Sequence, residues 1–225
     1  MEVKVLGPLI DKFLVEREHN REPRSKVLSA SEIASCARSL VYSLNETQKK
    51  PEEPRMLRIL DNGNYFHERI EHYVKELAKQ NKIKIVIMEE RKMDTELNFT
   101  GKCDSVVQFQ NVLAVKDQDV LLEFKSCNTK KFQMLTQPLD EHIWQVHAYM
   151  LLFNVHKALI IYEDKNQHDV KEFLVERNEE MINKIKTKIQ MVNRHFKEGT
   201  LPDKEYPRED WHCCWCKYFR ICWKT

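Results

Sequence analysis

The hydrophobic pattern changes its period near residue 80, and this change sets the fold class. Residues 56–80 carry apolar side chains at helical spacing, which predicts one long helix. Segments 82–93, 97–109 and 119–127 alternate and are rich in β-branched residues, which predicts three strands with a turn at Gln110–Asn111. The buried stripe of the long helix is expected to comprise Leu57, Leu60, Phe66, Ile70, Val74 and Leu77.

Further helices and strands flank this run. The expected helices are 6–19, a segment from a cap at Ser29 or Ser31 to about Asn45, 139–154 and 178–197. The expected strands are 157–164 and 170–176. This order predicts a mixed α/β fold in which helices cover the faces of a mixed sheet.

The chain has 225 residues, enough for one hydrophobic core with an accessory lobe. We expect an N-terminal helical segment at 1–50, a core at 51–200 and a cysteine-bearing segment at 201–225, with KKPEEP (49–54) as a turn or linker. Only four glycines occur, and neither common phosphate-binding glycine motif is present, which argues against nucleotide binding by those loops. The net charge of +2 is too small to indicate nucleic-acid binding by itself, so a polyanion would need a local groove.

The N-terminus mixes apolar and charged residues too closely for a secretory leader, and no apolar run approaches the roughly 18–20 residues that span a bilayer. We therefore expect a cytoplasmic protein without a membrane partner. Thiols stay reduced in that setting, so clustered cysteines indicate metal or cluster ligands rather than disulfides.

An acid and a base share one face of the expected strand 119–127. Side chains alternate along a strand, so Glu123 and Lys125 point one way while Leu122 and Phe124 point the other. Asp104 lies near the middle of the preceding strand, and antiparallel pairing could bring it beside Glu123. Two neighbouring carboxylates repel unless a cation lies between them, which favours Mg²⁺ or Mn²⁺. The alternative is a solvated salt bridge, since short E-x-K matches are common by chance.

Asp104 with Glu123-Phe124-Lys125 resembles the D…E-x-K core of the PD-(D/E)xK nuclease superfamily, in its RecB-like branch. Upstream, G-N-Y-F-H (63–67) resembles the histidine motif of that branch, and Q-V-H-A-Y (145–149) resembles its Q-x-x-x-Y helix. The resemblance implies a restriction-endonuclease-like core sheet flanked by helices.

The resemblance also implies roles for these residues. His67, Asp104, Glu123 and the Phe124 carbonyl would hold Mg²⁺ or Mn²⁺, and Lys125 would position the attacking water. Gln145 and Tyr149, an i, i+4 pair on one helix face, would contact a phosphate or orient Lys125. Without the resemblance, a histidine at the edge of a buried stripe is more often a packed residue. That reading is kept for His72, His142, His147 and His156.

Three cysteines near the C-terminus, Cys213, Cys216 and Cys222, are spaced C-x2-C-x5-C, so a four-ligand centre needs one more donor. Cys103 is expected in the core, Cys127 as a buried or idle thiol, and Cys214 and His212 as too close to Cys213 to turn toward the same centre. Cys36 is left.

RecB-like nucleases with an iron–sulfur cluster carry one cysteine before the core, as C-x-R-x-x-x-Y, and three after it. Cys36, Arg38 and Tyr42 match the first part. Four thiolates suit zinc as well as a 4Fe-4S cluster, and the one-plus-three distribution favours the 4Fe-4S cluster. The resemblance therefore implies that the cluster joins the two ends of the chain.

The whole pattern is most similar to the CRISPR-associated adaptation exonucleases and their virus-encoded relatives. It implies a metal-dependent DNA exonuclease acting on single strands, often from the 5′ end, in CRISPR adaptation or viral recombination. CRISPR integration proteins or a helicase are the possible partners. The alternative is an inactive DNA-binding scaffold for a helicase or integrase, and a structural zinc or RNA-processing protein is a third reading.

Several side chains are candidates to line a DNA path, or else are solvated or packed residues: Arg38, Lys130, Lys131, Tyr149, the pair Lys184 and Lys188, and the rings of Trp211, Trp215 and Tyr218.

Overall fold

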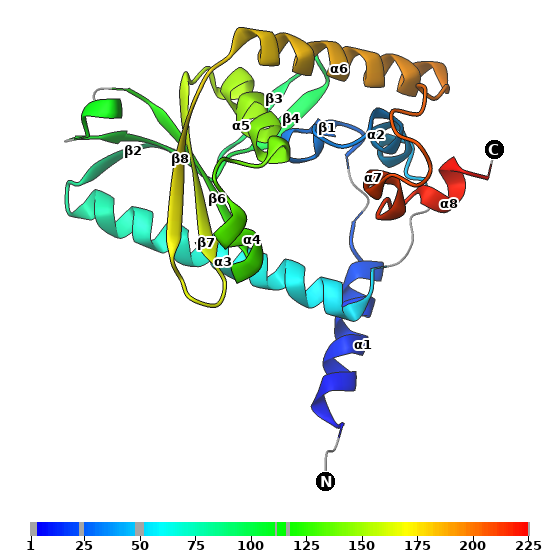
Figure 1. The fold of residues 1–225 in the computed structure, drawn as a ribbon, viewed down its shortest axis with the longest axis horizontal. Coiled ribbons are helices and arrows are strands. Elements are labelled where there is room, and N and C mark those ends of the chain that lie inside the picture. Colours follow the sequence, from blue (N-terminus) through cyan, green and yellow to red (C-terminus); the bar gives the residue numbers. More distant parts are fainter. Residues whose placement is uncertain (1–3, 23–24, 48–51, 111, 116–117, 225) are drawn as a thin grey trace.

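The computed structural model describes residues 4–22, 25–47, 52–110, 112–115 and 118–224. Its centre is a five-stranded sheet in the order β2-β5-β6-β7-β8, and a smaller sheet follows the order β1-β4-β3 (Figure 1). The strands of the large sheet are β2 (Ile83–Met88), β5 (Ser105–Phe109), β6 (Val120–Cys127), β7 (Lys157–Asp164) and β8 (Val170–Glu176). Neighbours are antiparallel except β6 and β7, which are parallel. The expected mixed α/β fold is confirmed.

Two helical layers cover the large sheet. The helix α3 (Pro54–Lys79) lies on one face over a cluster that includes Phe66, Val74 and Phe124. On the other face, α5 (Asp140–Phe153) and α6 (Glu179–Glu198) pack with α2 (Ala37–Leu44) in the larger core. The parallel β6–β7 pair requires a crossover, and α5 belongs to it. This topology places one face of α5 directly beside β6.

The strands expected at 157–164 and 170–176 and the helix expected at 6–19, which is α1 (Leu6–His19), have the predicted bounds. The single strands predicted over 82–93 and 97–109 are wrong. Each divides: the first into β2 and β3 (Arg91–Asp94), and the second into β4 (Phe99–Lys102) and β5.

The two chain segments 82–93 and 97–109 bend out of the large sheet at the same level. Beyond the bend they form β3 and β4 of the small sheet. At the break, Glu89 adopts a positive φ of 54°. Its N–H donates to the Asp104 carbonyl at 3.0 Å, and the Cys103 N–H donates to the Glu90 carbonyl at 3.2 Å. The two segments thus stay hydrogen-bonded through the bend. Asp104 lies at this corner and not inside a β-ladder, because aspartate is disfavoured within strands.

The predicted helix from Ser29 or Ser31 to Asn45 is also wrong in its first half. Residues 28–32 form β1 (Leu28–Ser29), paired with β4, and one 3-10 turn (Ala30–Glu32). The helix α2 begins only at Ala37, directly after Cys36. Tertiary pairing with the small sheet overrides the local capping signal.

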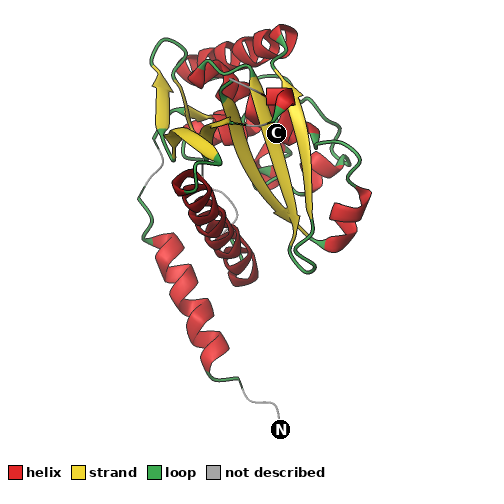
Figure 2. Ribbon diagram, turned by 90° about the vertical axis from the view of Figure 1, so that its left-hand side faces the viewer, coloured by secondary structure: helices red, strands yellow, loops and turns green. Residues whose placement is uncertain are grey.

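The long helix buries less than its pattern predicts. Leu57, Phe66 and Val74 are buried, whereas Leu60 is 52% exposed and Leu77 is 42% exposed. The first turns of α3 extend beyond the sheet toward α1, as Figure 1 shows. In Figure 2, α1 stands away from the body, with the N-terminus at its far end.

The C-terminal tail returns to the N-terminal part of the chain. The tail carries α7 (Trp211–Cys214) and α8 (Phe219–Cys222), which lie near α2. The Ala37 N–H donates to Glu205 Oε1 at 2.8 Å. The Tyr42 and Tyr218 rings lie 5.4 Å apart. The C-terminal tail is therefore in direct contact with α2.

The remaining elements are short: a 3-10 turn (Leu113–Val115) and α4 (Thr129–Met134). The domain boundary near residue 50, part of the 49–54 linker and Asn111 of the expected turn lie outside the described residues. The proposed division of the chain into three segments stays a prediction. Among the described residues, no helix is both long and apolar enough to cross a bilayer.

Gly101 in β4 offers a test of this packing. A Cβ there would lie 2.8 Å from Leu152 Cδ1, 2.9 Å from the Ala30 Cβ and 2.9 Å from Tyr149 Cε1. We expect Gly101→Ala to lower the free energy of unfolding by about 1–3 kcal/mol in urea titrations, because core atoms must shift. Gly63→Ala is the control, since its Cβ meets nothing within 4 Å. Because that site is inside a helix, this change should stabilise by about 0.5–1 kcal/mol. Equal effects would contradict this packing.

Candidate active site

The corner at Asp104 brings two carboxylates together. The last pair of the β5–β6 ladder is Ser105 with Leu122, so Asp104 lies beside Glu123. The Phe124 N–H donates to Asp104 Oδ2 at 3.0 Å, which fixes the carboxylate against β6. The arrangement expected from antiparallel pairing is therefore found, although Asp104 reaches it from a break and not from the middle of a strand.

Glu123 is a buried carboxylate with one oxygen unpaired. Its side chain is 2% exposed, and Lys125 Nζ lies 2.6 Å from Oε1. The other oxygen, Oε2, has no hydrogen-bond partner among the described residues. Burial raises the pKa of Glu123 to about 7, although Lys125 opposes the shift. A buried oxygen without a partner is costly, and a cation would compensate it.

His67 approaches the same corner from α3. Its Nδ1 lies 3.2 Å from Asp104 Oδ1, and its ring stands edge-on to Phe66. The Asp104 carboxylate raises the pKa of His67 above the ordinary 6.5, against the opposing effect of burial. An imidazole from α3 thus reaches the corner where Asp104 lies beside Glu123 of β6.

A chain of hydrogen bonds links Lys125 to α5. Lys125 Nζ donates to Gln145 Oε1 at 3.0 Å, and Gln145 Nε2 donates to the Tyr149 hydroxyl at 3.0 Å. Burial raises the pKa of Tyr149, so its hydroxyl stays protonated. The i, i+4 spacing on one helix holds the amide and the phenol on the same side. Gln145 and Tyr149 are thus linked to Lys125 by hydrogen bonds, and their expected role in orienting it stays a prediction.

Three further residues line the hollow beside His67 and Asp104: Glu71, Glu89 and Ser105. Sequence reasoning missed all three. Glu71 was detectable, because it lies one helical turn after His67 on the same face. Glu89 arrives through the bend between β2 and β3. Ser105 is 1% exposed, and its hydroxyl has no partner among the described residues.

The donor types of the site fit a hard divalent cation, because carboxylate oxygens and an imidazole surround the unpaired Oε2 of Glu123. Asp104 and Glu123 are instead held by His67 and Lys125. Within the described ranges, no group of three or more His, Cys, Asp or Glu side chains is close enough to hold a metal ion. Loading would therefore require side-chain movement.

The cysteines form a second group at the other end of the molecule. The charge of Cys216 helps to raise the pKa of Cys36, after the larger effect of burial. Cys222 and Cys216 raise that of Cys213, again after burial. Cys36 is thus within electrostatic reach of Cys216, and Cys213 within reach of Cys216 and Cys222, but no three of these thiols are close enough to hold a metal ion in the part of the chain that the structure describes. Cys103 and Cys127 are buried as expected, and Cys214 is exposed.

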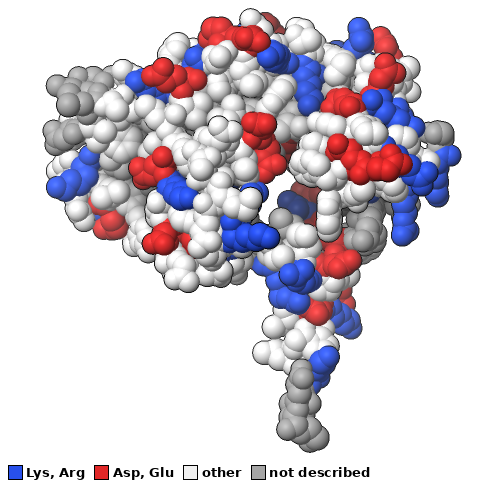
Figure 3. Space-filling model, viewed as in Figure 1, with Lys and Arg blue, Asp and Glu red and all other residues white. Residues whose placement is uncertain are grey.

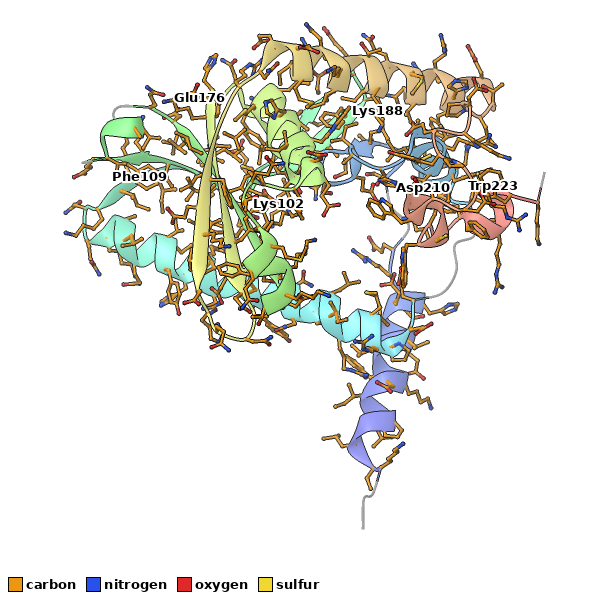
Figure 4. All side chains as sticks on the ribbon, in the orientation of Figure 1. Lys102, Phe109, Glu176, Lys188, Asp210 and Trp223 are labelled. Atoms are coloured by element: carbon orange, nitrogen blue, oxygen red, sulfur yellow. The ribbon has the colours of Figure 1, made fainter. Side chains whose placement is uncertain are left out.

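The residues expected along a DNA path are dispersed. Arg38 is half-buried near the cysteines, and its Nε has no hydrogen-bond partner among the described residues. Lys130 and Lys131 are exposed on α4. The pair on α6 does not form a free basic face, because Lys184 pairs with Glu180 and Lys188 packs on the Trp144 ring. Figure 4 shows Lys188 on α6 above the body.

A family profile described as the PD-(D/E)XK nuclease superfamily matches residues 4–223. The solved structure of SSO0001 superposes with a TM-score of 0.60 at 15% identity, covering 97% of this chain and 96% of that chain. LHK-Exo, an alkaline exonuclease from Laribacter hongkongensis, gives 0.55 at 16% identity in its complex with dAMP, covering 84% and 93%. A phage related exonuclease from Haemophilus somnus gives 0.53 at 14% identity, covering 76% and 94%. No relative is found among curated protein sequences.

The raised pKa of Glu123 has a consequence for stability. The native protein binds this proton more tightly than the unfolded chain, so stability is lost as the pH rises from about 4.5 to about 7. In metal-free buffer, we expect Glu123→Gln to remove this loss. Over that pH range, urea titrations should show the free energy of unfolding of the variant rising relative to that of wild type by on the order of 1–3 kcal/mol. Parallel pH profiles for the two proteins would refute a buried, destabilised carboxylate.

Proposed function

Because the chain belongs to the PD-(D/E)XK nuclease superfamily, we propose that it hydrolyses DNA phosphodiester bonds with the help of Mg²⁺ or Mn²⁺. The observation that carries the proposal is the unpaired Oε2 of Glu123, buried between Asp104 and Lys125. A chain that needed this corner only for stability would gain from an apolar residue there.

The proposed ligands are His67, Asp104, Glu123 and the carbonyl of Phe124. A bound divalent cation supplies neutralisation of phosphate charge and a lower pKa for bound water. In the structure Asp104 pairs with His67 and Glu123 pairs with Lys125, so these side chains must rearrange when a cation binds.

Lys125 carries the remaining role at the reacting phosphate. Its ammonium, steered by Gln145, donates hydrogen bonds to the attacking water or to a phosphate oxygen. Tyr149 fixes the Gln145 amide and so the direction of Lys125; because Tyr149 is only 4% exposed, no direct contact with DNA is proposed for it.

We further propose that the enzyme is an exonuclease, and that it prefers single-stranded DNA. Two of the solved structures that share the fold carry the word exonuclease in their descriptions, which supports the first part. Preference for single strands, 5′ polarity, a place in CRISPR adaptation or viral recombination, and integration proteins or a helicase as partners rest on the resemblance of the sequence motifs.

The direct test is hydrolysis of end-labelled single- and double-stranded DNA with Mn²⁺. We expect wild type to degrade single strands, and Asp104→Ala and Lys125→Ala to be slower by at least about 100-fold, because each loses stabilisation of the charged transition state. Lys84→Met, an exposed lysine of β2, and Asp119→Ala, an exposed carboxylate before β6, are the matched controls.

Cleavage by Asp104→Ala and Lys125→Ala at the wild-type rate would show that the site is elsewhere. Binding of DNA by wild type without hydrolysis would instead support an inactive scaffold. The first result would reject the proposed site, and the second would reject the proposed nuclease activity.

We propose that Cys36, Cys213, Cys216 and Cys222 hold a 4Fe-4S cluster, with zinc as the alternative. The contact of the tail with α2 supports the proposal, because it brings Cys36 within electrostatic reach of Cys216. Such a centre would fasten the two ends of the chain, which meet through few other bonds.

Metal analysis and visible absorption test this centre. We expect anaerobically purified wild type to be brown, with about four irons per chain, and Cys36→Ser to lose both the iron and the colour. Cys214→Ser is the control, because that thiol is exposed and its sulfur contacts the Glu209 carbonyl instead. A colourless protein with one zinc per chain would replace the cluster by zinc.

A further inference from the structure

The tail exposes two large aromatic rings. Trp215 is 86% exposed and Trp211 is 62% exposed. Tryptophan is the largest apolar side chain and is highly buried on average in soluble proteins, so two such rings within five residues are unusual. Figure 4 marks the tail by Asp210 and Trp223, at the end of the molecule opposite β2.

Trp211 is the outer member of a stack of three rings. Its centroid lies 3.7 Å from that of His212, and the His212 ring lies 4.0 Å from Tyr206 at an interplanar angle of 13°. Asp210 holds the stack, because its Oδ1 accepts from the His212 N–H at 2.8 Å and lies 2.6 Å from His212 Nδ1. The outer ring is therefore oriented before any ligand arrives.

The segment that carries these rings is basic. Residues 211–224 contain Lys217, Arg220 and Lys224 and no acidic residue. Of the carboxylates just upstream, Asp210 is engaged with His212 and Glu205 with the Ala37 N–H, whereas Glu209 is exposed. In Figure 3, Lys and Arg side chains gather at the outer edge of the molecule where α8 lies in Figure 1. An anionic partner with flat apolar groups matches this surface.

We propose that Trp211 and Trp215 form a stacking platform for the unpaired bases of single-stranded DNA, with the phosphates held by Lys217 and Arg220. Exposed rings among cations are the means by which proteins bind single strands without reading sequence. The inference rests on the proposed function and extends it to substrate choice, because paired bases present no free faces to such rings. An apolar protein partner would use the rings but not the flanking cations.

Binding can be measured apart from cleavage. The test uses full-length Lys125→Met in metal-free buffer, so that DNA stays intact. The probes are a fluorescent 15-nucleotide oligo-dT and an abasic strand with the same number of phosphates. Tryptophan quenching and anisotropy report binding, and circular dichroism and metal content report the fold.

We expect Trp215→Leu and Trp211→Leu, each in the Lys125→Met background, to weaken oligo-dT binding at least about fivefold. Abasic binding should change less than twofold, since phosphate contacts remain, and Trp215→Phe should recover most of the loss. Phe13→Leu is the control, an exposed ring on α1. Blunt duplex DNA should bind more weakly than oligo-dT.

Two results would overturn the platform: unchanged oligo-dT affinity in both leucine variants, or equal losses on oligo-dT and the abasic strand. In either case, retained binding by the Lys125→Met parent leaves the DNA nuclease standing. No binding of any strand by the parent would instead remove the proposed function along with the platform. The platform would also be rejected if a protein ligand quenched the tryptophan fluorescence while no DNA strand was bound.

Discussion

The burial of Glu123 beside Lys125 is the constraint on which the rest of the site depends. A carboxylate that is 2% exposed, with one oxygen unpaired, destabilises the strand that carries it unless a charge is placed close by. Lys125 supplies part of that charge on the same face of β6. His67 and Asp104 complete the polar surroundings, and α5 holds the lysine through Gln145. The side chains around the middle of β6 are thus arranged to compensate the Glu123 carboxylate, whose burial costs free energy.

The bend between the two sheets makes this arrangement possible. If β4 and β5 were one strand, Asp104 would lie inside a ladder, with its carboxylate competing with the backbone bonds on both sides. At the corner, its Oδ2 instead accepts the Phe124 N–H, and the matching bend at Glu89 keeps the neighbouring strand in register. The small sheet that continues beyond the corner also provides β4, whose Gly101 allows Tyr149 to pack closely. The break between β4 and β5 therefore shapes both the fold and the site.

The cysteine-bearing tail is the region to which we assign a second, proposed function. It contacts α2, and its outer surface presents rings and cations. A strand held there would be guided by stacking and charge. The body would supply the acidic corner where a phosphodiester can be hydrolysed. Binding the strand in one region and hydrolysing it in another would suit a nuclease that does not read sequence.

The sequence by itself determined the superfamily, the mixed α/β class and the bounds of α1, β7 and β8, because these follow from local periodicity and from residue types at fixed spacing. It also placed Asp104 next to Glu123, since alternation and antiparallel pairing are local rules. Only the tertiary structure decided the corner at Asp104, the late start of α2 and the exposure of Leu60 and Leu77. These depend on which surfaces meet across long sequence separations. The approach of Ser105 to the site and the exposure of Trp215 were decided in the same way, because burial belongs to the assembled fold and not to any one segment.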